Sequence, residues 1–237
     1  MKTHHKVAIS LIIALLVTAV LVAQKPTKQV TDFDHFPILD YEKKSASDTS
    51  GKKTRKKYNN RHAPRISEST DKIFSFNDWE VGLPALPIAK SAAVIVGEVT
   101  EGKAELSEDE TNIYSEFTVQ IAQVLKNDNS LSLGIGNSVL VERSGGRVRL
   151  PSGKVVVSRT DKQDLPKVGK RYVLFLTRDE DEDFHILTGY ELRDGVVFPL
   201  DKLRPGHPIT AYTGSSETSF FADLNRILVN PSTSQSR

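Results

Sequence analysis

AAVIVGEVTE, residues 92–101, and IYSEFTVQIAQVLK, residues 113–126, are the two stretches that decide the fold. The first is a continuous apolar run with β-branched residues, as expected for a strand covered on both faces. The second alternates apolar and polar side chains over residues 117–121 and changes phase around Ala122 and Gln123. A change of phase within one strand predicts a β-bulge or a sharply coiled strand. We therefore expect both stretches to be strands, with the acidic GKAELSEDETN between them as a loop.

Short apolar stretches separated by glycine turns make up most of the following sequence. They are SVLVER, RVRL, KVVVSR, RYVLFLTR, FHILTGYEL and VVFPLD. The last two are joined by Arg193-Asp194-Gly195, and Asp-Gly suits the positive φ angles of a tight hairpin. Short strands with frequent turns predict a mainly β fold, either an antiparallel barrel or a sandwich.

The C-terminal stretch SSETSFFADLNRIL changes to a helical period. Its apolar residues fall on one helical face: Phe220, Phe221, Leu224, Ile227 and Leu228. Ser215 or Ser216 can cap the first turn. We expect this α-helix to pack over one open end of the β structure.

The N-terminus predicts a membrane segment. After the basic lead MKTHHK, residues 7–23 carry no charge, and their only polar side chains are Ser10 and Thr18. A helix of about this length can just span a bilayer. Leu21 and Ala23 match the small residues of a cleavage site poorly, which favours an uncleaved anchor over a cleaved signal peptide. A buried helix of a soluble protein is the remaining alternative.

Lysines on both sides of this segment make the positive-inside preference weak. We predict a single-pass protein with residues 1–6 in the cytoplasm and the bulk of the chain outside it. If the segment is a signal peptide, the protein is instead secreted after cleavage.

Residues 24–78 have the composition of a disordered, basic tether. Apolar residues are sparse, and residues 51–65 contain seven Lys or Arg and no acid. This run is either a solvated spacer or a contact for anionic envelope polymers or lipid headgroups. Its candidate contact residues are Lys52, Lys53, Arg55, Lys56 and Lys57. Tyr58 is the one aromatic residue beside them, which argues against nucleic acid as the partner.

A folded module is predicted over residues 79–229, followed by a disordered tail at residues 230–237. About 150 residues suffice to bury a single core. The chain of 237 residues has a net charge of +2 and no cysteine. Disulfides, thiolate metal sites, cysteine nucleophiles and a lipidated cysteine are therefore excluded.

The module lacks common catalytic motifs. It has no HExxH, no GxSxG, no GxxxxGK[ST] and no GxGxxG after a strand. His185 and His207 are its only histidines. His207 lies in RPGHP, which is typical of a rigid surface turn, and Ser144 has no basic partner at local spacing. The sequence thus predicts no catalytic residue and no bound cofactor.

Residues 176–189, LTRDEDEDFHILTG, place five consecutive carboxylates between two apolar stretches. We expect Tyr172–Leu176 and Phe184–Leu187 to pair as antiparallel strands, with Arg178–Asp183 as the exposed connection. A solvated turn is the favoured interpretation, with weak calcium binding and a catalytic cluster as alternatives. The calcium ligands would be Asp179, Asp181 and Asp183, although the central glycine and terminal glutamate of an EF-hand loop are missing.

Several motifs between Ala92 and Leu203 resemble those of known protein families. The order AAVIVGEVTE, YSEFTVQIAQVLKND, VERSGGRVRLPSG, PKVGKRYVLFL and GYELRDGVVFPLD resembles a family of uncharacterised bacterial exported or membrane-anchored proteins. The pattern VIVGEV…FTVQIAQVLK…VGKRYVLFL is also similar to the OB-like barrel of netrin-type modules and tissue inhibitors of metalloproteinases. The resemblance implies an OB-like barrel at the cell envelope. Those modules usually carry cysteines, which this chain lacks, so no functional residue is carried over.

These features predict a membrane-anchored, extracytoplasmic β module that acts by binding an unknown protein partner. The alternative is a cell-envelope hydrolase whose active site is not visible as a motif. A pocket that joins His185 or His207 to a carboxylate and a serine would indicate the hydrolase. An exposed apolar or aromatic groove would indicate binding.

Overall fold

The computed structural model describes residues 32–41, 53–76, 78–128 and 132–230. The predicted membrane segment at residues 7–23 lies outside these ranges, as does the chain after Asn230. None of the helices within the described ranges combines the length and apolar character that crossing a bilayer requires.

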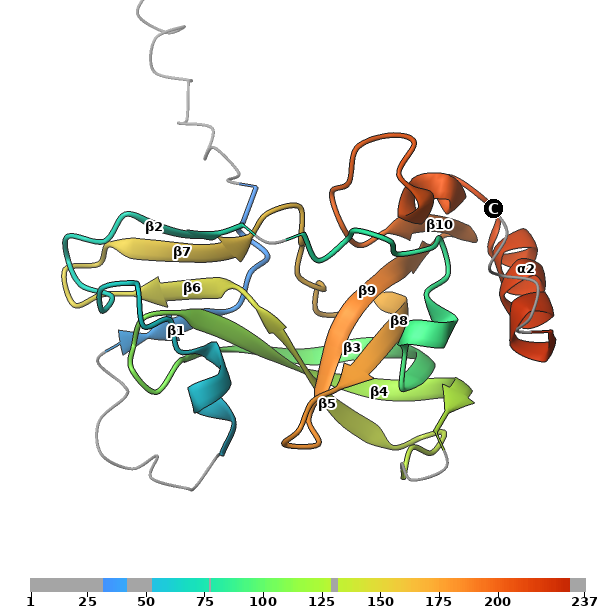
Figure 1. Ribbon diagram of the computed structural model, residues 1–237, viewed down its shortest axis with the longest axis horizontal. Helices are drawn as coiled ribbons and strands as arrows, with labels where there is room; N and C mark the ends of the chain where they lie inside the picture. Colours follow the sequence, from blue (N-terminus) through green and yellow to red (C-terminus); the bar gives the residue numbers. More distant parts are fainter. Residues whose placement is uncertain (1–31, 42–52, 77, 129–131, 231–237) are drawn as a thin grey trace, which may run out of the picture. The chain divides into compact units, whose positions relative to one another are not determined.

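Ten strands and one C-terminal α-helix are the main elements of the described residues (Figure 1). The strands are β1 (Ile38–Asp40), β2 (Lys72–Ser75), β3 (Ala93–Leu106), β4 (Ile113–Asn127), β5 (Ser138–Ser144), β6 (Gly146–Arg149), β7 (Val155–Thr160), β8 (Arg171–Arg178), β9 (Phe184–Arg193) and β10 (Val196–Pro199). The helices are η2 (Lys53–Tyr58), η3 (Ile88–Lys90), η4 (Pro208–Tyr212) and α2 (Glu217–Val229). The predicted mainly β fold with a C-terminal helix is confirmed.

The larger sheet has six strands in the order β10-β9-β5-β4-β3-β8. An additional pairing of β8 with β9 closes β3, β4, β5, β9 and β8 into a ring. All neighbours in this ring are antiparallel except β5 and β9, which are parallel. Their register places Val141 opposite Phe184 and Glu142 opposite His185. This short parallel contact brings the middle of the chain beside the predicted acidic hairpin.

Strand β3 has the environment that its apolar run predicts. It lies between β4 and β8, and Ala93–Val96 are buried. The register with β4 places Val96 opposite Gln123 and Gly97 opposite Ile121, so Ala122 is the extra residue of a bulge. The predicted change of phase is confirmed. Gly97 is required here, because a Cβ atom would lie 2.7 Å from the carbonyl oxygen of Gln120.

The smaller sheet has the order β1-β6-β7-β2, with β1 parallel to β6 and β2 parallel to β7. This differs from the disordered tether expected over residues 24–78, because β1, η2 and β2 all fall within that range. The two edge strands are short and pair with distant strands, and Leu39 and Ile73 pack only partly buried against the cluster that contains Val148. Among the described residues of this region, Phe36 and Ile66 are buried.

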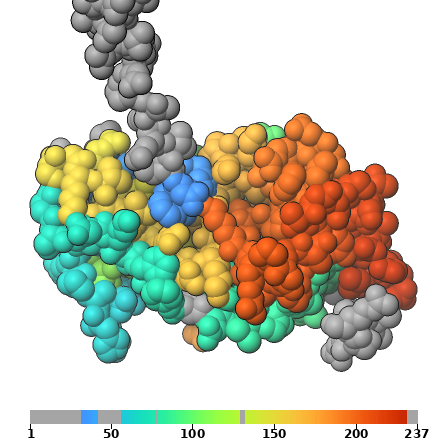
Figure 2. Space-filling view, turned by 90° about the horizontal axis from the view of Figure 1, so that it is seen from above, coloured from blue at the N-terminus to red at the C-terminus, as the bar shows by residue number. Residues whose placement is uncertain are grey.

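The buried ion pair Arg143–Asp201 lies beside the contact that holds the N-terminal segment, His35–Asp164. Arg143 of β5 contacts the Asp201 carboxylate with N–O distances of 2.8 and 3.0 Å. Arg143 also donates to the carbonyl of Asp164, whose carboxylate lies 2.7 Å from His35 Nε2. In Figure 2 the blue segment that contains His35 lies against residues coloured yellow. Residues that precede the predicted module are therefore part of the folded body.

The main core lies between the ring, β10 and the C-terminal helix. Phe220 and Leu224 of α2 are buried against Val197, Ile209 and Tyr190. Ser216 caps the helix, since its side chain accepts a hydrogen bond of 3.2 Å from the Ser219 amide. The predicted helical face and its serine cap are confirmed.

Candidate functional site

The acidic stretch forms the tip of the hairpin between β8 and β9. Leu176 pairs with Ile186, as predicted, and β8 continues two residues beyond the predicted strand, so that Arg178 pairs with Phe184 and the connection is residues 179–183. Asp179 closes the turn, because its Oδ1 atom accepts hydrogen bonds of 3.0 Å from the amides of Asp181 and Asp183. The hairpin prediction is confirmed, and its first carboxylate has a structural role in the turn.

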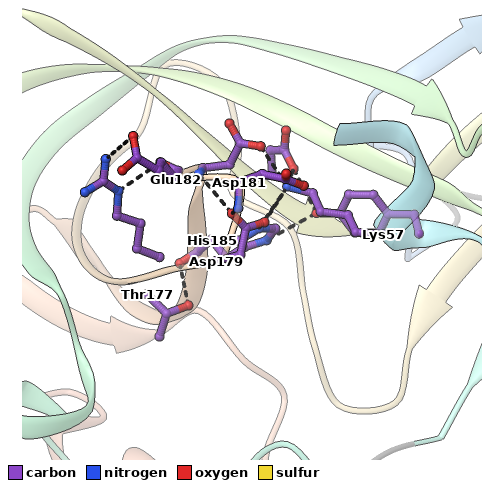
Figure 3. Close-up of polar contacts among 10 residues, drawn as sticks. Lys57, Thr177, Asp179, Asp181, Glu182 and His185 are labelled. Carbon is purple, nitrogen blue, oxygen red and sulfur yellow. Dashed lines mark hydrogen bonds and ion pairs between the residues drawn. The ribbon is translucent and has the colours of Figure 1, made fainter. Parts of the chain in front are cut away.

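The turn is not only solvated, because Lys57 from helix η2 reaches into it (Figure 3). Its Nζ atom lies 2.8 Å from Asp179 Oδ2, 3.1 Å from Asp183 Oδ2 and 2.9 Å from Glu142 Oε2. His185 Nε2 is 3.1 Å from the same Nζ atom and 2.8 Å from Asp179 Oδ2. One ammonium group is thus surrounded by three carboxylates and an imidazole, which we call the acidic pocket.

Tyr58, the next residue, also contacts the acidic pocket. Its ring stacks on that of Tyr114 from β4, with centroids 4.2 Å apart and planes at 7°. Its hydroxyl donates to Glu142 Oε2 at 3.1 Å and lies 3.2 Å from His185 Nδ1. Tyr114 is fully buried, and Glu142 is only 3% exposed. The Lys57–Tyr58 pair therefore seals a carboxylate away from water.

Burial and hydrogen bonding determine the charge state of the pocket. Burial alone would lower the pKa of Lys57, but hydrogen bonds to Asp179, Glu142 and Asp183 raise it above its ordinary value. Burial alone would raise the pKa of Asp179, but hydrogen bonds from Lys57 and His185 hold it far below its ordinary value. Burial raises the pKa of Glu142, and Lys57 and Tyr58 oppose this effect only in part. Lys57 is accordingly a cation whose charge the pocket requires.

The following residues hold the segment to a second acidic loop, between β3 and β4. The amide of Asn60 donates to Thr111 Oγ1 at 2.8 Å, and Asn59 Oδ1 accepts from the amide of Asp109 at 3.2 Å. Asp109 is itself held by the Thr111 hydroxyl at 2.6 Å. Residues 57–60 thus bridge the loop at residues 107–112 and the hairpin tip.

A groove of about 350 Å³ adjoins the pocket on the side of β5. It lies between the start of β5, the residues before it and the hairpin tip, and it shares Glu142 and Asp183 with the pocket. Leu140, one of its lining residues, is 47% exposed, and Ser132 and Ser138 supply hydroxyl groups. We call this space the β5 groove.

The two histidines of the module, His185 and His207, have different surroundings. Both ring nitrogens of His185 face the pocket, where they meet Asp179, Lys57 and Tyr58. His207 instead begins η4, and its Nδ1 atom accepts from the Ile209 amide at 3.3 Å. No hydrogen bond found in the described ranges joins a serine hydroxyl to either imidazole. His207 thus has the role of a turn residue.

The suggested calcium ligands do not act together. Asp179 and Asp183 converge on Lys57, whereas Asp181 is exposed at the tip. Within the described residues, no group of three or more His, Asp or Glu side chains has an arrangement that could hold a metal ion. The position that a cation would take beside Asp179 is filled by the Lys57 ammonium group.

The sequence singled out Asp179, Asp183, His185 and Lys57, but in separate roles and not as one site. Lys57 was assigned to a disordered contact surface for anions, and Glu142 and Tyr114 were not candidates at all. Tyr58, as an aromatic residue inside a basic run, was the one available signal. Neither protein-family models nor the curated proteins provide any match to the chain, so the site is interpreted from its own geometry.

Proposed function

We propose that the chain is a membrane-anchored, extracytoplasmic binding module built on an OB-like barrel. The order of strand pairing supports the barrel. Around the ring the strands follow the order β3-β4-β5-β9-β8, whereas in the sequence β8 precedes β9. An OB-fold is a five-stranded Greek-key barrel that binds ligands on its second and third strands and through loops 1–2 and 4–5. The corresponding parts of this chain are β4, β5, residues 107–112 and residues 179–183.

One observation carries the proposal of binding: residues 57–60 occupy this same surface. They contact both loops and lie on Tyr114 of β4 and Glu142 of β5. The surface therefore holds a polypeptide segment through ion pairs, hydrogen bonds and stacking. It has the parts of a recognition site.

The negative charge of the acidic pocket indicates which kind of partner can bind there. Glu142, Asp179 and Asp183 surround the pocket, so it favours a cationic partner and disfavours anionic polymers or nucleic acid. Contact with anionic lipids through the basic run would exclude Lys57, because its ammonium group is already engaged. We propose a polypeptide partner with a positively charged segment.

Binding is favoured over the alternative of a hydrolase. Catalysis needs a nucleophile within hydrogen-bond reach of its base. The contacts of His185 run to Asp179, Lys57 and Tyr58, an arrangement that stabilises an ion pair. Ser138 lines the neighbouring groove, but its hydroxyl donates to Gln120 Oε1 at 3.1 Å.

A photo-crosslinking experiment in native membranes tests this function. A photoreactive amino acid replaces Leu140 in the groove of the full-length chain, and Val168 serves as the matched control. Both are exposed apolar residues, at 47% and 54%. We expect a discrete polypeptide adduct from position 140 and none from position 168. Equal adducts, or none at either position in the wild-type and Lys57→Ala backgrounds, would contradict a partner at this surface.

A further inference from the structure

The segment that fills the acidic pocket precedes the module in the chain and contacts it as a ligand would. Its contacts fall on four separate places: β4, β5, the β3–β4 loop and the β8–β9 tip. Two adjacent side chains supply the charge and the stacking, Lys57 and Tyr58. The arrangement is a cation followed by an aromatic ring, held over Tyr114.

The pocket has a built-in requirement for such a cation. A carboxylate that is 3% exposed, as in Glu142, is costly to keep charged unless a cation and hydrogen bonds compensate for the loss of water. An ammonium group has three donors, which matches the three carboxylates around Lys57. The flat face of Tyr114 then selects an aromatic neighbour.

The β5 groove provides the approach for a second polypeptide. It shares Glu142 and Asp183 with the pocket, and the exposed Leu140 side chain gives it an apolar lining residue. A segment lying in this groove would lie beside Glu142 and Asp183, two of the carboxylates that hold Lys57. An incoming cation would therefore compete directly with Lys57.

We infer that the acidic pocket recognises a Lys- or Arg-aromatic pair of a partner polypeptide, and that Lys57–Tyr58 is its resident occupant, displaced when the partner binds. This inference rests on the proposed binding function. An occupant in the same chain has an effective concentration of about millimolar. Because it competes for the pocket, it raises the apparent Kd of a partner. The resident pair thus sets a threshold for the affinity and local concentration of the partner.

The direct test uses a peptide of the chain's own sequence, KTRKKYNN, which corresponds to residues 53–60. The peptide carries a fluorophore, and fluorescence anisotropy reports its binding to the detergent-solubilised full-length chain. We expect the Lys57→Ala/Tyr58→Ala double variant to bind it at least about tenfold more tightly than the wild type does. A peptide with both alanine substitutions should bind to neither protein.

Lys56→Ala is the matched control, because Lys56 is the exposed neighbour of Lys57. This variant should bind the peptide as weakly as the wild type. Tyr58→Ala, which keeps the cation beside Glu142, guards against misfolding of the double variant and should show an intermediate affinity. The fluorescence of Trp79, whose indole donates to the Asp161 carbonyl at 3.0 Å, reports whether each variant keeps its fold. Equal peptide affinity in folded wild type and double variant would overturn the inference.

The crosslinking experiment distinguishes failure of the inference from failure of the proposed function. Adducts at position 140 that increase in the double variant support both. Adducts of equal yield in wild type and double variant support the function but overturn displacement of a resident occupant. Adducts absent from both proteins overturn the function and, with it, the inference. Peptide binding to the double variant without membrane adducts would leave the pocket as an internal docking site and overturn the role of a partner.

Discussion

The Lys57 ammonium group has three carboxylate oxygens within 3.1 Å, so each of these residues depends on the others for its charge state. Asp179 contributes twice, because it also accepts the two backbone amides that close the hairpin turn. Asp181 has no part in the ion pairs and is exposed. Two residues of the same acidic run therefore have different energetic roles.

Asp179→Asn and Asp181→Asn form a matched pair that tests this difference. Asparagine keeps a side-chain oxygen for the turn but removes the charge beside Lys57. We expect Asp179→Asn to lower the free energy of unfolding by about 1.5 kcal/mol and Asp181→Asn to change it by less than about 0.5 kcal/mol. Urea denaturation measures both. A loss of equal size in the two variants would show that the acidic run acts as one solvated group.

The stability difference between wild type and Asp179→Asn should also depend on pH. The pKa of Asp179 lies well below its ordinary value of 3.8, mainly because hydrogen bonds from Lys57 and His185 outweigh burial. A carboxyl group whose pKa is lowered on folding stabilises the protein above its unfolded pKa, and this contribution is lost as the pH falls towards the folded pKa. The difference should be constant above about pH 5 and decrease below about pH 4. Chemical denaturation at several pH values measures it, and a difference that increases on acidification would contradict the assignment.

Substitutions of core residues in the hairpin strands should change the free energy of unfolding much more than substitutions at the hairpin tip. Leu174 of β8 is fully buried, a few residues from Asp179. Leu174→Asp places an unpaired charge in the core, and we expect a loss of about 3–5 kcal/mol or failure to fold. Leu174→Met is the volume-conserving control and should cost less than about 1.5 kcal/mol. Thermal unfolding followed by circular dichroism measures both variants.

At the scale of elements, the sequence predicted the features that depend on residues close together in the chain. The bulge at Ala122, the hairpin from β8 to β9 and the cap of α2 each follow from residues close together in the chain. The sequence did not predict the edge strands β1 and β2, because they are short and pair with distant strands, β6 and β7. For the same reason local patterns did not predict the acidic pocket: Lys57, Glu142 and Asp179 come from η2, β5 and the β8–β9 turn, which lie far apart in the sequence.

Hydrogen exchange tests whether the edge strands belong to the folded body. Ile73 and Phe74 of β2 pair with β7, and Leu39 of β1 pairs with Val148. We expect the amides of these strands that bond to β6 and β7 to exchange at least about 100-fold more slowly than an unstructured chain does. The exposed residues at the hairpin tip, such as Glu180, serve as the internal control for rapid exchange. Unprotected amides throughout residues 35–41 and 72–75 would restore the tether interpretation.

At the scale of the whole molecule, the binding proposal depends on where the module is held. The apolar segment at residues 7–23 precedes the folded body, and its expected role is to fix that body at a membrane surface. Restricting the module to a surface raises its effective concentration towards partners in the same membrane. A weak, competitively occupied site is then sufficient for recognition.

Membrane fractionation and N-terminal sequencing test this anchor. The full-length chain should stay with membranes during an alkaline carbonate wash and should keep residues 1–23, because the apolar run is uncharged and its cleavage site is poor. Leu15→Asp/Leu16→Asp places two charges near the centre of the run, at an insertion cost of about 2.5–3.5 kcal/mol each, and should release or destabilise the chain. Leu15→Ile/Leu16→Ile preserves the apolar character and should remain in the membrane fraction. A mature chain that begins near Gln24 would instead establish a cleaved signal peptide, and partner encounters would then depend on the soluble concentration of the module.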